Sequence, residues 1–216
     1  MMQTTILNTN SDSKQIVEIA VQLLLSGEVI AFPTDTVYGF GVDINNTTAA
    51  EKIYSLKNRS AVKPLNALID NIESVSDICR DIPDDFYKLA DKFFPGPLAV
   101  ILKRSETVSS IVTSGMDTLA VRMPDCKIVR DIIQSLGRQI ASTSANVSDQ
   151  TSADNADDVY KDFNRKLPLL IDGGKSTHGK ESTVLSLVTQ EPTIFRQGVI
   201  TKEDIEAVLN KSVRTI

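Results

Sequence analysis

Two groups of residues in the first third of the chain have side chains of the kind that bind anions. The first is the run PTDTVYG at residues 33–39, which places hydroxyl groups and a carboxylate where the apolar stretch Val29–Phe32 ends. The second contains three cations within seven residues, Lys57, Arg59 and Lys63. Because the chain as a whole carries a net charge of −5, this local positive charge indicates an anionic ligand, of which phosphate is the most common.

Polar residues also lie at the ends of predicted strands later in the chain. The run STSAN at residues 142–146 follows one strand, and Arg122 ends another. The run EST at residues 181–183 opens a strand, and Arg196 closes one. Each of these has a simple structural explanation as a turn residue or a surface cation. Open α/β sheets bind ligands at the carboxyl ends of their strands, so the repeated placement favours one shared site.

Two other motifs do not support a function. The run GKS at residues 174–176 resembles the end of a Walker A loop, but that motif requires a glycine at position 169. Leu169 stands there, inside an apolar predicted strand. His178 is the only histidine, so no histidine cluster can hold a metal, and the chain lacks the G-x-S-x-G elbow of a Ser-His-Asp hydrolase.

The composition is ordinary for a globular protein. The 216 residues are 41% hydrophobic and 24% charged, which is enough to bury a sizeable core, and no linker divides them. The acidic net charge argues against tight non-specific binding of nucleic acid over a broad face. Cys79 and Cys126 lack C-x-x-C spacing, which is typical of a reducing compartment and gives no metal signature. No signal peptide or apolar run of membrane length is present, so we expect a cytoplasmic protein.

Helix and strand patterns alternate along the chain, and Asp12 with Gln15 resembles a capping box at the start of the first helix. The expected helices are 12–27, a second from a cap at Asn46 or Thr47 through Leu56, then 83–93, 129–136 and 201–209. The expected strands are 29–32, 65–69, 99–102, 119–122, 139–142, 169–172 and 183–187. Residues 149–158, rich in Ser, Asp and Asn, are expected to form a loop. This alternation predicts an α/β fold with a mixed sheet covered by helices.

Eight motifs follow one another over essentially the whole chain. They are PTDTVYGFG (33–41), LKNRSAVKPL (56–65), FFPGPLAVIL (93–102), LAVRMP (119–124), STSANVS (142–148), IDGG (171–174), ESTV (181–184) and FRQG (195–198). In this order they closely resemble the threonylcarbamoyl-AMP synthase family, whose domain is of the YrdC type. The resemblance implies a three-layer α+β arrangement with a twisted mixed sheet and an open basic cleft. Larger members of the family carry a second C-terminal domain, and we expect the single-domain form, over residues 1–216.

The resemblance also implies an activity. Enzymes of this family are nucleotidyltransferases that join L-threonine, bicarbonate or CO2, and ATP into threonylcarbamoyl-adenylate and release pyrophosphate. Mg²⁺ is expected to enter with ATP, and no permanently bound protein metal is expected. The expected protein partners are transferases that pass the threonylcarbamoyl group to an adenosine of tRNA, with at most a weak contact to the tRNA itself and no membrane.

The matching positions carry the family's site residues. The implied roles are catalytic for Lys57 and Arg59; ATP-binding for Arg59, Lys63, Thr118, Asn146, Ser152 and Arg196; and L-threonine-binding for Thr36, Arg122, Ser144 and Ser182; no residue is expected to bind a metal. The chain departs from the family at two places. Leu68 stands where many relatives have a histidine that contacts threonine, and Asp149 replaces a common glycine.

Three alternatives remain open at this point. The first is a non-catalytic RNA-binding module, against which the acidic net charge and the lack of aromatic or arginine-rich stretches count. The second is carbamoyl transfer from carbamoyl phosphate, as in hydrogenase-maturation proteins, which carry zinc-binding cysteine clusters that this chain lacks. The third is a scaffold in a tRNA-modifying complex, which the intact basic cluster disfavours.

Overall fold

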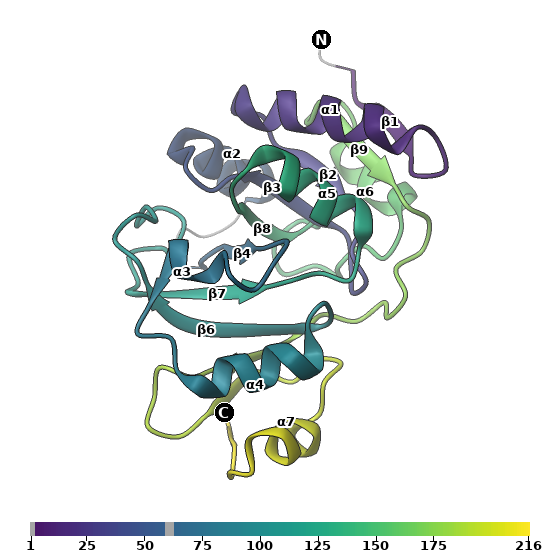
Figure 1. The fold of residues 1–216 in the computed structure, drawn as a ribbon. Helices are drawn as coiled ribbons and strands as arrows, with labels where there is room; N and C mark the ends of the chain where they lie inside the picture. The colour runs from purple at the N-terminus through teal and green to yellow at the C-terminus, as the bar shows by residue number, and fades with distance from the viewer. Residues whose placement is uncertain (1–2, 59–62) are drawn as a thin grey trace.

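The computed structural model describes residues 3–58 and 63–216, and these fold around one twelve-stranded mixed β-sheet (Figure 1). The strands are β1 Thr5–Asn8, β2 Ile30–Phe32, β3 Gly39–Asp43, β4 Asn66–Leu68, β5 Cys79–Arg80, β6 Leu98–Arg104, β7 Thr118–Arg122, β8 Ile140–Ser144, β9 Leu169–Asp172, β10 Thr183–Ser186, β11 Thr193–Arg196 and β12 Arg214–Thr215. Their order across the sheet is β1-β9-β2-β3-β8-β4-β7-β6-β10-β11-β12, and β5 pairs with β6. Parallel pairs such as β2·β9 and antiparallel pairs such as β3·β8 both occur, which confirms the predicted mixed sheet.

Seven helices occur in the described part of the chain. They are α1 Ser13–Leu25, α2 Thr47–Lys57, α3 Val75–Ile78, α4 Asp84–Phe93, α5 Lys127–Leu136, α6 Ala156–Phe163 and α7 Lys202–Leu209. All five expected helices are confirmed, with Asp12 capping α1 and Asn46 capping α2 through their side-chain oxygens. Gly137 ends α5 with φ 71°, a left-handed conformation that glycine adopts without strain.

The expected loop at residues 149–158 is wrong from Ala156 onward, because α6 begins there. The side chain of Asn155 accepts a hydrogen bond from Asp158 N, and Asp157 and Asp158 lie in the first turn, where acidic side chains favour the helix dipole. The polar composition that indicated a loop is therefore the composition of a helix start.

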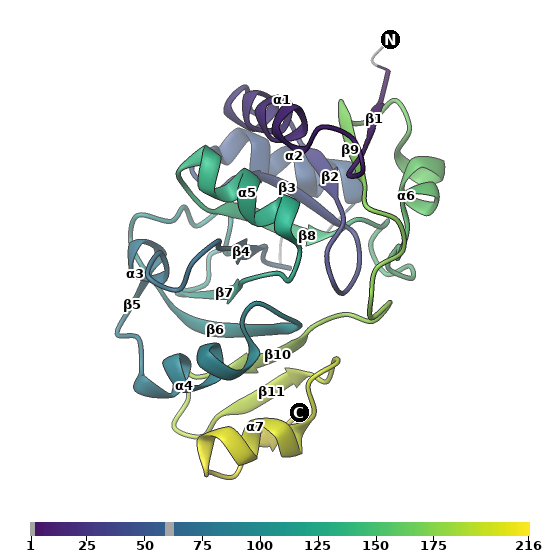
Figure 2. The same cartoon turned by 45° about the vertical axis from the view of Figure 1, so that its right-hand side comes forward.

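Helices cover both faces of the sheet, so the predicted three-layer arrangement is confirmed. On one face, α1 and α5 lie side by side and pack on Phe32 and Ile140 (Figure 1). On the other face, α2 and α6 contact β3 and β9, and Ala31 and Ala141 belong to the hydrophobic cluster on that face. Helices α4 and α7 pack against each other near β6, β10 and β11 (Figure 2). The two termini lie at opposite ends of the molecule (Figure 2).

Strand β3 is absent from the expected elements because its first and third residues are Gly39 and Gly41. A Cβ at Gly41 would lie 2.5 Å from the ring of Phe32 and 2.6 Å from the Ile140 side chain. Because the two glycines have no side chains, the Phe32 ring can lie across β3. There it packs in the hydrophobic cluster below α1 and α5.

Beyond Phe32 and Ile140, the face that carries α1 and α5 becomes polar. Side chains alternate between the two faces of a strand, so Ser142 and Ser144 follow Ile140 on this face of β8. On the neighbouring β4, Asn66 lies opposite Ser142 of β8, and Leu68 lies opposite Arg122 of β7. The sheet therefore brings a row of polar side chains from three strands to one open surface.

Candidate functional site

A cavity of about 180 Å³ lies on this polar part of the sheet. Its lining includes all four predicted threonine-binding residues and one predicted ATP-binding residue: Thr36, Arg122, Ser144, Ser182 and Arg196. They come from the segment before β3, the ends of β7 and β8, the residue before β10 and the end of β11. Leu68 also lines the cavity, so the departure at the family's histidine position faces the site.

Arg122 is held by three hydrogen bonds to protein groups. Its Nε donates to Gly96 O at 2.9 Å, its Nη1 donates to Thr36 Oγ1 at 2.8 Å, and its Nη2 forms an ion pair with Asp35 Oδ1. A guanidinium group has five N–H donors, so two remain, one on each terminal nitrogen. Two N–H groups in that geometry match the two oxygens of a carboxylate.

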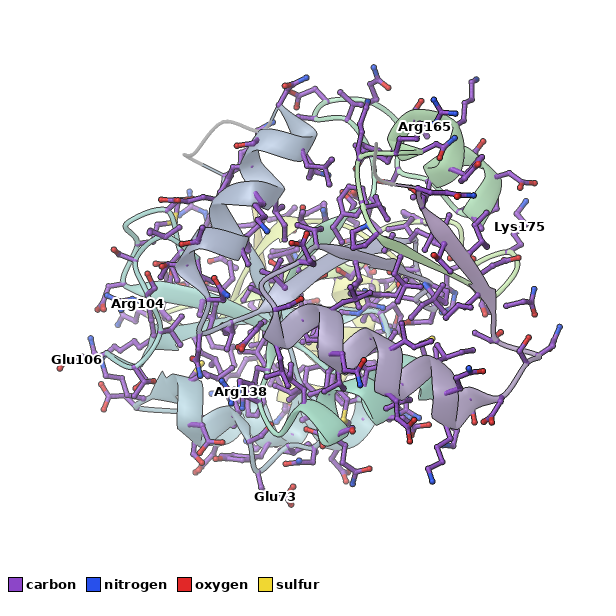
Figure 3. The ribbon with its side chains drawn as sticks, turned by 90° about the horizontal axis from the view of Figure 1, so that it is seen from above. Glu73, Arg104, Glu106, Arg138, Arg165 and Lys175 are labelled. Atoms are coloured by element: carbon purple, nitrogen blue, oxygen red, sulfur yellow. The ribbon has the colours of Figure 1, made fainter. Side chains whose placement is uncertain are left out.

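The Asp35–Arg122 pair is buried, with 5% of the Asp35 side chain and 8% of the Arg122 side chain exposed. Burial lowers the pKa of Arg122, and the charge of Asp35 opposes that shift. Asp35 Oδ1 also accepts from Asp125 N at 3.1 Å, just before α5. In contrast, Glu73, Glu106 and Lys175 project from the outer edge of the molecule, where water solvates their charges (Figure 3).

The segment before β3 is fixed by its own hydroxyl groups. Thr34 Oγ1 accepts from Thr36 N at 3.2 Å and Val37 N at 3.3 Å, which orients the Thr36 hydroxyl toward Arg122. Tyr38 donates its hydroxyl to Gly174 O at 2.7 Å, and burial raises its pKa to about 12, so it stays protonated. The sequence analysis assigned no role to Asp35, Thr34 or Tyr38, although all three lie in the first motif.

Lys57 lies behind the cavity and not on its lining. It is 1% exposed, its Nζ donates to Asn146 Oδ1 at 3.0 Å, and it also contacts Ser144 O. Ser144 Oγ donates to the same oxygen of Asn146 at 2.6 Å. The structure thus shows Lys57 fixing two predicted site residues from below, while its predicted role on phosphate stays a prediction.

A second group of contacts surrounds Arg196, which also lines the cavity. Arg196 donates to Ser182 O at 3.1 Å and Ser182 Oγ at 3.2 Å, and to Glu181 Oε2 at 2.6 Å. The other oxygen of Glu181 accepts from Ser152 Oγ at 2.8 Å. The sequence analysis noted Glu181 among the polar residues at strand ends but assigned it no role at the site.

The other predicted ATP-binding residues that the structure describes do not line this cavity. Lys63 forms an ion pair of 2.5 Å with Asp149, whose φ of 67° is one that the glycine of relatives adopts easily. Thr118 lies on the same face of β7 as Arg122, four residues earlier, and does not line the cavity. Arg59 lies outside the described residues. A basic cleft therefore stays a prediction: Lys63, Arg122 and Arg196 each have a carboxylate partner.

A larger cavity, of about 360 Å³, lies on the other side of Thr34, between the start of α5 and residues 173–177. Its lining among the described residues contains none of the predicted site residues. Leu169 is in β9, which confirms that the GKS run after this strand is not a Walker A loop. Within residues 3–58 and 63–216, no three His, Cys, Asp or Glu side chains group as metal ligands.

Comparison with known proteins gives one consistent result. A family model named Sua5_yciO_yrdC, with the description "Telomere recombination", matches residues 22–198. Proteins named threonylcarbamoyl-AMP synthase are similar: one of Pyrococcus abyssi is 38% identical over 90% of this chain, and one of Bacillus subtilis is 41% identical over 93%. The crystal structure of P. abyssi Sua5 complexed with L-threonine superposes with a TM-score of 0.95 at 37% identity, over 99% of this chain.

This chain is shorter than those relatives. It spans 57% of the P. abyssi protein and 58% of the B. subtilis protein in sequence, and 63% of the P. abyssi chain in structure. The expectation of a single-domain form accordingly stays a prediction.

We predict that Asp35→Asn lowers the free energy of unfolding by about 3–5 kcal/mol, because it leaves the Arg122 guanidinium buried without a counter-charge. Urea unfolding measures this loss. Asp43→Asn is a matched control, since Asp43 is equally buried but its partner Arg138 is 41% exposed. The control should cost at most about 1 kcal/mol. Equal losses in the two variants would show that the Asp35 pair is not specially stabilising.

We also predict that Lys57→Met destabilises the fold by about 1–3 kcal/mol, because buried oxygens of Ser144 and Asn146 lose a donor. Lys52→Met, on the same helix, removes a lysine that is 43% exposed and should cost less than about 1 kcal/mol. The comparison uses urea unfolding of both variants. If Lys57→Met were as stable as the unsubstituted chain, the structural role of Lys57 would be refuted.

Proposed function

Because the chain belongs to the Sua5/YciO/YrdC family, we propose that it is an L-threonylcarbamoyladenylate synthase, a nucleotidyltransferase that uses L-threonine, bicarbonate or CO2, and ATP. The curated relatives that share this name, at 38% and 41% identity, support the proposal. So does the 0.95 TM-score to a relative whose structure contains L-threonine.

The observation that carries the proposal is the fixed guanidinium of Arg122 at the base of the cavity. Its two remaining N–H donors can bind the carboxylate of an amino acid, and the hydroxyl-bearing residues Thr36, Ser144 and Ser182 line the same cavity. The side-chain hydroxyl and the amine of threonine would find hydrogen-bond acceptors and donors among the residues of this lining. Leu68 and Val184 add apolar surface for a methyl group.

The chemistry requires positioning and charge neutralisation. The neutral amine of threonine attacks the carbon of CO2, and a proton passes from its nitrogen to water as the carbamate forms. A carbamate oxygen then attacks the α-phosphorus of ATP in line, and the bond to the β-phosphate oxygen breaks to release pyrophosphate. Neither step needs a protein nucleophile, and cations such as Arg196, Lys63 and Arg59 would neutralise the developing charge.

Mg²⁺ is proposed to enter with ATP, where it would neutralise part of the triphosphate charge. The protein residues fit an ion held mainly by phosphate oxygens and water. Among the described residues, Glu181 is the one carboxylate in the lining of the smaller cavity, and both of its oxygens already accept hydrogen bonds.

The product is proposed to pass to transferases that modify tRNA in the cytoplasm. A carbamoyl-adenylate is a reactive mixed anhydride, so an acceptor must consume it soon after its release. Both cysteines are unpaired, which is consistent with a reducing compartment. Among the described residues, no helix has the length and apolar character needed to cross a membrane.

Pyrophosphate release from ATP tests the proposal, with Mg²⁺ and bicarbonate present. We predict release that depends on L-threonine, is far weaker with L-valine, and disappears without bicarbonate. Arg59→Ala should lower turnover sharply while leaving the unfolding transition unchanged, because its predicted partner is phosphate. If no pyrophosphate is released under any of these conditions and the chain binds RNA in a salt-sensitive way, the synthase proposal is wrong and an RNA-binding function is supported.

A further inference from the structure

Glu181 connects two predicted nucleotide-binding residues that are far apart in the sequence. Its Oε2 pairs with Arg196 Nη1 at 2.6 Å, and its Oε1 accepts from Ser152 Oγ at 2.8 Å. Ser152 lies in the loop between β8 and α6, whereas Arg196 ends β11. A carboxylate at the wall of a site for phosphates would by itself repel them, so its presence there requires another explanation.

The geometry around Arg196 repeats that around Arg122. In each case three N–H groups donate to the protein, one of them to a carboxylate and one to a backbone carbonyl, and two N–H groups remain. For Arg122 the carboxylate is Asp35, and for Arg196 it is Glu181. The two guanidinium groups are close enough for the charge of Arg196 to lower the pKa of Arg122. Both therefore face one site, each held in a single orientation.

The backbone on either side of Glu181 is also fixed. A Cβ at Gly198 would lie 2.3 Å from Ser182 C and 2.4 Å from Glu181 O, so only glycine lets the segment after β11 pack against residues 181–183. Gly198 N donates to Thr183 Oγ1 at 3.0 Å. The segments that carry Glu181 and Arg196 are thus packed closely against each other at Gly198.

The loop that carries Ser152 is anchored on its other side. Asn146 Nδ2 donates to Gln150 O at 2.6 Å, and Tyr38 N donates to Ala153 O at 2.9 Å. Ser152 lies between these two anchors, and its bond to Glu181 joins the loop to the segment before β10. Glu181 therefore spans the cavity wall from the loop to β11.

We propose that Glu181 is a positioning residue for the nucleotide: it holds Arg196 and Ser152 as one unit, so that both meet ATP in a preformed arrangement. This inference rests on the proposed function and deepens it. Glu181 is not itself assigned a contact with threonine, because the threonine carboxylate is assigned to Arg122. The charge of Glu181 is neutralised by Arg196.

Two substitutions separate the two contacts. Glu181→Gln keeps an oxygen for Ser152 but places an N–H₂ group against Arg196, whereas Ser152→Ala removes only the hydroxyl. We expect Glu181→Gln to raise the KM for ATP about tenfold, which is about 1.4 kcal/mol, and to change kcat and the KM for threonine less than about twofold. Ser152→Ala should raise the KM for ATP about fivefold. The double variant should lose less than the product of the two, because both act through one unit.

A matched control and a second readout keep the test decisive. Asp85→Asn removes a carboxylate that pairs with Lys211 at 2.5 Å, away from the cavity, and should leave both KM values unchanged. Direct ATP binding by calorimetry, on the same full chains, measures the effect without turnover, and the unfolding midpoints should be equal for Glu181→Gln and the unsubstituted chain.

The outcomes distinguish this inference from the proposed function. Normal turnover of the unsubstituted chain with an unchanged KM for ATP in Glu181→Gln would overturn the positioning role alone. A rise in the KM for threonine and not for ATP would overturn it as well, because Glu181 would then contact the amino acid. Absent turnover with ATP binding that Glu181→Gln weakens tenfold would overturn the synthase and support the positioning role. Absence of ATP binding would overturn both.

Discussion

The ion pair between Asp35 and Arg122 is the interaction on which the rest of the site depends. A guanidinium that is almost fully removed from water is tolerated only with a counter-charge and hydrogen-bond acceptors nearby. The structure provides both from separate parts of the chain: the carboxylate from the turn before β3, a hydroxyl from Thr36, and a carbonyl from Gly96. The same carboxylate binds the backbone ahead of α5. One charge pair thus fixes the relative positions of a turn, a central strand and a helix start.

The sheet explains why these groups meet at an open surface. One face of β8 carries Ile140 under α1 and α5 and then Ser142 and Ser144 beyond the helices. Gly39 and Gly41 on β3 have no side chains, so nothing projects from this face of the strand at these two positions. Side chains there would collide with Phe32. The apolar half of this face supports two helices, and its polar half is free to form a binding site. The core and the cavity are consecutive parts of the same strands.

Sequence reasoning predicted most of the frame from local patterns, whereas the site residues came from the family resemblance, and five of them lie on the cavity lining. Capped amphipathic helices such as α1 and short apolar strands such as β9 have signals within a few residues of the element. Strand β3 and helix α6 were missed because glycines and cap residues read as turn signals. Lys57 shows a different limit. Its burial depends on Asn146, a contact across 89 residues, and nothing near Lys57 in the sequence indicates it. Glu181 was assigned no role for the same reason, since both of its partners are distant.

The central claim is that Arg122, held by Asp35, receives the carboxylate of L-threonine. Calorimetric titration of the full chain with L-threonine and with L-threoninol, which has a hydroxymethyl group in place of the carboxylate, tests it most directly. The account predicts that threonine binds and that threoninol binds at least about a hundredfold more weakly, because a charge-assisted bidentate contact is lost. Equal affinity for the two compounds would contradict the account, because the substrate carboxylate would then not be what Arg122 binds.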